Sequence, residues 1–197
     1  MKCTIFGQIG RTLRNTAALA AVMCATAWAG EKTAFDLAKE ADKHVGEDAK
    51  GKVVQLRSEK SIGSLTPNIW YVVLYDTDAT AKATEVKFGA GQKLSVKRPA
   101  RVLELGFKDH LPLDKDKLKV DSDEAIKTAT SEPLVKNLKL TASKLTLEKW
   151  EGQPVWKVRL WAEKLRDSRK DADIGEVIIA ADTGKVLKND LKIDRVD

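Results

Sequence analysis

The chain has 197 residues and a formal net charge of +6, with 35 Lys and Arg residues set against 29 Asp and Glu residues. The two signs alternate along the chain and form no clustered basic stripe, which argues against a nucleic-acid partner. Only two histidines are present, they are not paired in sequence, and neither has a cysteine partner outside the N-terminal segment, so a zinc site is not expected.

Residues 1–29 are predicted to be a Sec-type signal peptide. The basic residues Lys2, Arg11 and Arg14 precede a small apolar run over 16–24, and Ala27-Trp28-Ala29 fits the small-x-small rule for cleavage. The run is too short to span a bilayer, and no later stretch is long and apolar. We therefore expect a periplasmic or secreted bacterial protein with no transmembrane segment after the signal peptide. An uncleaved N-terminal anchor and a lipid anchor on Cys24 are the alternatives.

Cleavage after Ala29 would change both the charge and the redox chemistry of the chain. Both cysteines, Cys3 and Cys24, lie in the segment that is removed, so the mature protein would contain no disulfide although its compartment would allow one. The net charge would fall from +6 to +3, because three basic residues are lost. The fold must then be held together by its core alone.

The first half of the remaining chain reads as one helix followed by four strands. A helix is predicted over 33–44, with Thr33 as its cap and Gly46 as its stop. β-branched and aromatic residues with alternating polarity predict strands over 53–58, 69–75, 85–88 and 92–97. Gly89-Ala90-Gly91 is the expected hairpin turn between the last two strands.

The second half repeats this order. Asp121 is predicted to cap a helix that Pro133 ends or bends. Strands are expected over 144–150, 155–163, 176–181 and 185–191, with an exposed charged loop over 164–173 between the second and third. The fold class that follows is α+β, with two tandem repeats that each pack helices on one face of a three- to four-stranded antiparallel sheet. The predicted boundaries are a first repeat at 30–100, a linker at 101–120 and a second repeat at 121–197.

The order of motifs in the second repeat resembles the PepSY domain. The residues that carry the likeness are Pro154-Val155-Trp156-Lys157-Val158, Glu176-Val177-Ile178-Ile179-Ala180 and Thr183-Gly184-Lys185-Val186-Leu187. The first repeat is a more distant relative that lacks the Asp-x-Thr-Gly turn, and the tandem layout is similar to beta-lactamase-inhibitor-protein-like folds. The resemblance implies peptidase inhibition or protein binding in the cell envelope, and it supplies no catalytic residues.

Strand periodicity divides the aromatic residues between two faces. Trp70 and Trp156 share a face with aliphatic residues and are predicted to be core residues under the helices. The opposite face would carry Tyr71, Val73 and Tyr75 beside Gln55, Arg57, Glu85 and Lys87, and Thr146, Glu148 and Trp150 beside Lys157, Arg159 and Trp161. Aromatic and Arg side chains on an open sheet are typical of protein-binding surfaces. The predicted binding residues are Tyr71, Tyr75, Trp150, Arg159 and Trp161; the alternative is that the aromatic residues pack against one another.

No catalytic or cofactor motif is recognisable in the chain. Asp114-Lys-Asp116 and Asp171-Ala-Asp173 lack the glycine and glutamate that a calcium loop requires, and no phosphate-cradling loop or nucleophile elbow is present. We therefore expect a non-enzymatic protein without metal or cofactor that binds an unidentified protein or peptide of the cell envelope. An accessory or structural envelope protein with no inhibitory role is the alternative.

Overall fold

The computed structural model describes residues 32–99 and 111–197, and its main feature is one antiparallel sheet of eight strands in the order β4-β3-β2-β1-β5-β6-β7-β8. The strands are β1 (Val53–Ser58), β2 (Ile69–Tyr75), β3 (Ala83–Gly89), β4 (Gln92–Lys97), β5 (Leu140–Trp150), β6 (Gln153–Lys164), β7 (Asp167–Ala180) and β8 (Val186–Leu191). The predicted signal peptide, both cysteines and residues 101–110 of the predicted linker, with His110, lie outside the described residues.

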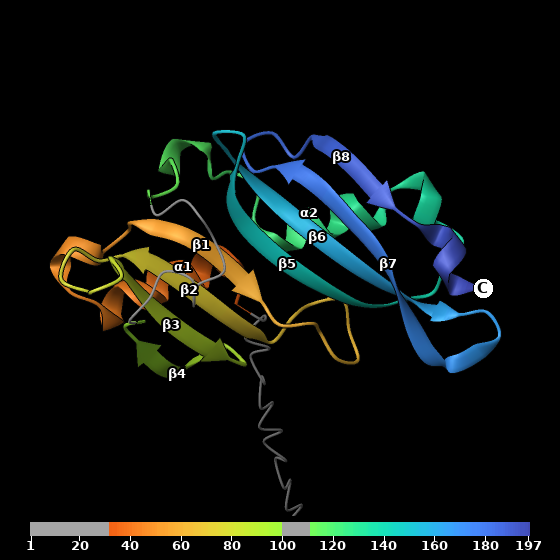
Figure 1. The fold of residues 1–197 in the computed structure, drawn as a ribbon, viewed down its shortest axis with the longest axis horizontal. Coiled ribbons are helices and arrows are strands. Elements are labelled where there is room, and N and C mark those ends of the chain that lie inside the picture. Colours follow the sequence, from red (N-terminus) through yellow and green to blue (C-terminus); the bar gives the residue numbers. More distant parts are fainter. Residues whose placement is uncertain (1–31, 100–110) are drawn as a thin grey trace, which may run out of the picture.

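The predicted fold class, two tandem repeats that each have a small sheet of their own, is wrong. The first strands of the two halves pair with each other, Leu56 with Leu147 and Arg57 with Thr146, so all eight strands of the described residues belong to one continuous sheet. The sheet dominates the molecule and the helices are short (Figure 1). Local periodicity located each of the eight strands except the first part of β7, but the fold class depended on this one long-range pairing.

The β1–β5 junction is completed by serine side chains where the regular ladder ends. Ser58 Oγ accepts a hydrogen bond from the backbone N–H of Leu145 at 2.9 Å, and Ser61 Oγ accepts one from the N–H of Ser143 at 2.8 Å. The N–H of Ser61 in turn donates to the carbonyl oxygen of Ser143 at 2.8 Å. The two halves are therefore joined by side-chain hydrogen bonds as well as by two ladder pairs.

Both helices cover the same face of the sheet. α1 (Ala34–Ala41) lies behind the strands of the first half in Figure 1, and α2 (Ser122–Thr130) lies behind those of the second. Short 3-10 turns follow them, η1 (Asp42–His44) and η2 (Glu47–Ala49) after α1 and η5 (Pro133–Val135) after α2; η4 (Lys115–Lys117) precedes α2, and η6 (Ile193–Val196) ends the chain. The opposite face of the sheet, called the open face below, carries no helix among the described residues.

The capping predictions for the two helices are confirmed, and the caps also connect the helices. Thr33 and Asp36 form a capping box at the start of α1, and Asp121 caps α2. Asp121 Oδ1 also accepts a hydrogen bond from the N–H of Phe35 at 3.1 Å, and Ser122 Oγ accepts one from the N–H of Ala34 at 3.0 Å. Residues far apart in sequence thereby satisfy amide groups that a helix start leaves unpaired.

A single hydrophobic core lies between the helices and the sheet. Trp70 of β2 and Trp156 of β6 meet edge to face, with ring centroids 6.5 Å apart, and the ring of Phe35 on α1 lies 6.2 Å from that of Trp156. Both indole groups donate hydrogen bonds to backbone oxygens, those of Pro67 and Val120. The prediction that these tryptophans are core residues is confirmed, but they share one core rather than anchoring two.

The predicted exposed loop over 164–173 is also wrong, because β7 begins at Asp167 and pairs with β6 from Lys164 onward. A bulge at Gly175 lets the long strand bend. Gly175 has a φ of +103°, and a Cβ at this position would stand 2.1 Å from the backbone oxygen of Asp190. The charged composition of this segment reflects a strand that extends past the helices, so its side chains are largely exposed.

Candidate functional site

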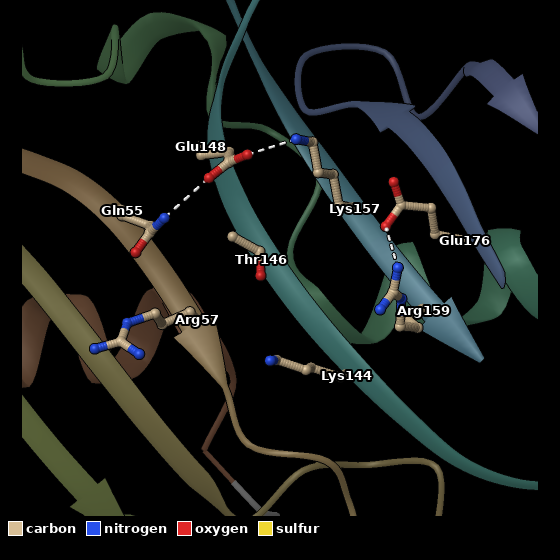
Figure 2. Close-up of a pocket in the computed structure, with 8 residues that line it drawn as sticks. All are labelled: Gln55, Arg57, Lys144, Thr146, Glu148, Lys157, Arg159 and Glu176. Carbon is tan, nitrogen blue, oxygen red and sulfur yellow. Dashed lines mark hydrogen bonds and ion pairs between the residues drawn. The ribbon is translucent and has the colours of Figure 1, made fainter. Parts of the chain in front are cut away.

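The open face is hollowed where the two halves of the sheet meet. The hollow has a volume of about 270 Å³. Its lining, shown in Figure 2, comes from β1 (Gln55 and Arg57), β5 (Lys144, Thr146 and Glu148), β6 (Lys157 and Arg159) and β7 (Glu176). Thr146 is paired with Arg57 on one side and with Lys157 on the other. The short threonine side chain between two long ones explains why the surface is depressed here.

Basic side chains outnumber acidic ones in this lining. Four cations face two carboxylates, Glu148 and Glu176, which leaves a formal charge of +2. Two of the cations have carboxylate partners outside this lining: Arg57 forms an ion pair with Glu85 of β3, and Arg159 lies 3.5 Å from Asp173 as well as 3.8 Å from Glu176 of the lining. With Glu85 and Asp173 included, four carboxylates meet four cations, but the pairing is uneven, because Arg159 has two partners and one cation has none.

Lys144 is that cation. Its side chain is exposed, and within 32–99 and 111–197 it makes neither an ion pair nor a side-chain hydrogen bond. Lys144 stands directly opposite Arg159 in the β5–β6 ladder, so two cationic side chains leave neighbouring strands at the same level; the Lys144 ammonium points toward β1 and the Arg159 guanidinium lies beside Glu176 (Figure 2). This arrangement costs stability unless an anion lies between the two groups.

The floor of the hollow holds a fixed carboxylate and two unpaired polar atoms. Glu148 accepts hydrogen bonds from Gln55 Nε2 at 2.9 Å and from Lys157 Nζ at 2.6 Å, so both of its oxygens are occupied. Gln55 Oε1 and Arg57 Nε are buried and have no hydrogen-bond partner. A buried acceptor and a buried donor without partners are uncommon in folded proteins and mark the floor as incompletely satisfied.

Tyr71, one of the predicted binding residues, lies beside the hollow and is held by charged neighbours. The guanidinium of Arg57 stands 4.4 Å and the ammonium of Lys87 4.9 Å from its ring centroid, and its hydroxyl donates to Glu59. The hydrogen bonds from Tyr71 and Lys87 lower the pKa of Glu59. The aromatic face of Tyr71 therefore supports the Arg57 guanidinium at the edge of the hollow.

The other predicted binding residues are distributed over the open face. Arg159 lines the hollow, and Trp161 follows on the same strand, half-buried, with Lys60 Nζ 4.8 Å from its ring centroid. Tyr75 packs against a small apolar cluster of Val54, Val73 and Ala83. Trp150 is half-buried at the end of β5, opposite Gln153. Arg159 is thus the one member of the predicted set that lines the hollow.

Sequence reasoning assigned six of the lining residues to the open face and selected one of them, Arg159, as a binding residue; it missed Lys144 and Glu176. The period-2 rule was sufficient to place Lys144 on that face, because it lies two residues before Thr146 on the same strand. The signal for its importance is its pairing with Arg159 and the proximity of β1, and this register is available only from the folded sheet.

No protein-family model matches the chain, and neither a curated protein nor a solved structure is significantly similar to it. The described residues contain no helix long and apolar enough to cross a membrane. They also contain no group of three or more His, Cys, Asp and Glu side chains placed to hold a metal ion.

Proposed function

We propose that this chain is a non-enzymatic binding protein of the bacterial cell envelope and that the open face of its sheet receives a protein or peptide partner. The observation that carries the proposal is the contrast between the two faces of the sheet. The helices cover one face, whereas the other presents a hollow with exposed cations and half-buried aromatic residues beside it. Arg, Tyr and Trp are the residues that most often contribute binding energy at protein interfaces.

The PepSY resemblance supports the same reading and suggests the mode of action. In that family the implied roles are peptidase inhibition and protein binding. We propose that this chain modulates a peptidase or another envelope protein by binding it through the open face. The predicted signal peptide supports an envelope location. The proposal assigns no chemistry to the hollow, whose charged side chains are paired with one another, with Glu85 or Asp173 beside it or, in the case of Lys144, exposed to solvent.

The proposal is tested by affinity capture from a bacterial envelope extract. The parent protein is compared with Trp161→Ala, which alters the open face, and with Leu134→Ala, which truncates an exposed apolar residue of η5 on the helix side. We expect the parent and Leu134→Ala to retain the same protein and Trp161→Ala to retain less of it. Equal recovery by all three, or no specific retention by the parent, would show that the proposal is wrong.

A further inference from the structure

Three cations cross the junction between the two halves of the sheet. Arg57 lies on β1, Lys144 on β5 and Arg159 on β6. Lys144 faces Arg159 directly, and Arg57 is paired with Thr146, two residues along β5 from Lys144. Neighbouring strands are about 4.8 Å apart and two residues rise about 6.6 Å along a strand, so the three side chains begin within roughly 12 Å of one another. The sheet therefore gathers three cationic side chains at the point where its halves join.

These three cations differ in how much of their charge is already compensated. Arg57 has a carboxylate partner in Glu85, and Arg159 has two distant ones at 3.5 and 3.8 Å. Lys144 has none among the described residues, although it stands beside another cation. An incoming anion at Lys144 and Arg159 would relieve this repulsion and would gain charge-assisted hydrogen bonds from both side chains.

We propose that the hollow binds an acidic peptide segment, with a carboxylate of that segment held between Lys144 and Arg159 and a second one within reach of Arg57. This inference rests on the proposed function, because it names the chemical class of the partner that the open face receives. The carboxylates of Asp and Glu side chains match the guanidinium of Arg in shape as well as charge.

The floor of the hollow favours a peptide over an inorganic anion. Gln55 Oε1 is an acceptor without a donor, and Arg57 Nε is a donor without an acceptor. A peptide group offers both an N–H and a carbonyl oxygen, whereas phosphate offers mainly acceptors at neutral pH. Both atoms are buried, so a ligand would reach them only after the surrounding side chains move.

Fluorescence anisotropy with labelled homopeptides tests this proposal directly. The probes are oligoglutamate and oligoglutamine of equal length, with inorganic phosphate and citrate as competitors. We expect oligoglutamate to bind, oligoglutamine to bind much more weakly, and the affinity for oligoglutamate to fall as salt is raised, because screening shortens the Debye length to about 8 Å at physiological ionic strength. Equal binding of the two peptides, or binding of phosphate or citrate without binding of oligoglutamate, would overturn the proposal.

Two lysine substitutions, one in the hollow and one on the helix side, test where on the protein the peptide binds. Lys144→Gln removes the unpaired cation, and Lys136→Gln makes the same change at an exposed lysine beside η5 on the helix side. We expect Lys144→Gln to weaken oligoglutamate binding about fivefold. The charge reversal Lys144→Glu should weaken it further, and Lys136→Gln should leave it unchanged. Equal losses from Lys144→Gln and Lys136→Gln would show that binding depends on net charge alone, which would overturn the assignment.

Capture from the envelope extract separates this inference from the function on which it rests. If Trp161→Ala loses the retained protein and Lys144→Glu keeps it, the open face binds a partner but the acidic-segment proposal is wrong. If both variants lose it while Lys136→Gln keeps it, both proposals are supported. If both variants keep it, both are wrong.

Discussion

The two faces of β6 show how one strand serves two purposes. Trp156 points toward the helices, is fully buried and donates its indole N–H to Val120, whereas Arg159 points to the opposite side and keeps about half of its side chain in solvent. The covered face satisfies its polar atoms and excludes water. The open face retains repelling charges and unpaired atoms. Such unfavourable features, which among the described residues lie on the open face, support the proposal that this face binds a ligand.

The largest difference between the two faces is expected when one tryptophan on each face is replaced by alanine. Trp156→Ala removes a side chain with no exposed surface and leaves a cavity between Trp70 and Phe35, so we expect a loss of about 3–5 kcal/mol in the free energy of unfolding. Trp161→Ala alters a half-buried residue of the open face and should cost about 1 kcal/mol. Urea denaturation of both variants measures the difference, and equal losses would contradict the assignment of the two faces.

The alternation that separates these faces could be predicted from the sequence. Trp70, Val72 and Leu74 alternate with Tyr71, Val73 and Tyr75, and the strand occupies the predicted 69–75. The rule works here because one face is buried and hydrophobic. The alternation rule failed at 167–173, because charged residues lie on both sides of β7 there and no alternation of polarity indicates a strand.

The union of the two halves could not be predicted, because no local pattern encodes it. The β1–β5 ladder has two pairs, and the rest of the junction depends on hydrogen bonds to Ser58 and Ser61. The candidate site shares this limitation: Lys144 and Arg57 approach each other only through the β1–β5 register. Aromatic residues were selected from sequence because their type is informative, whereas an exposed lysine becomes informative through its neighbours.

The next largest loss of stability is expected at the serine side chains that join β1 to β5 and so make the sheet continuous. Ser58→Ala leaves the N–H of Leu145 without its acceptor in a buried position, so we expect a loss of about 1–3 kcal/mol in unfolding free energy. Ser64→Ala is the matched control, since its hydroxyl bonds to an exposed loop oxygen. Hydrogen exchange should show faster exchange of the Leu145 amide in Ser58→Ala, and unaltered stability and exchange would contradict the structural role of this hydroxyl.

A smaller effect is expected at acid pH from Asp76, which follows β2. Burial raises its pKa, but hydrogen bonds from Thr84 and the N–H of Asp78, with the charge of Arg98, outweigh burial and hold the pKa below its usual value. The folded state therefore binds this proton less readily than the unfolded state. The stabilisation is present above the unfolded pKa near 3.8 and is lost as pH falls through the lower folded pKa.

Comparison of the parent with Asp76→Asn isolates this contribution from other carboxylates. At neutral pH the variant should be less stable by about 1 kcal/mol, because an amide cannot accept both hydrogen bonds as well as a carboxylate does. The difference should shrink as the pH is lowered below 4, and urea unfolding over this range measures it. A difference that stays constant with pH would show that Asp76 does not titrate as its contacts require.

The smallest effect on stability is expected when a single carboxylate is removed from the open face. Glu176 is one of two carboxylates near Arg159 and stands 3.8 Å away, so Glu176→Gln should change the unfolding free energy by no more than about 0.5 kcal/mol. It should nevertheless raise the affinity for oligoglutamate about two- to threefold, because it releases Arg159 from a competing carboxylate. Glu124→Gln makes the same charge change on the exposed side of α2 and should leave that affinity unaltered. An equal gain from both variants would assign the effect to net charge. A gain confined to Glu176→Gln would support binding of the acidic peptide at Arg159 on the open face.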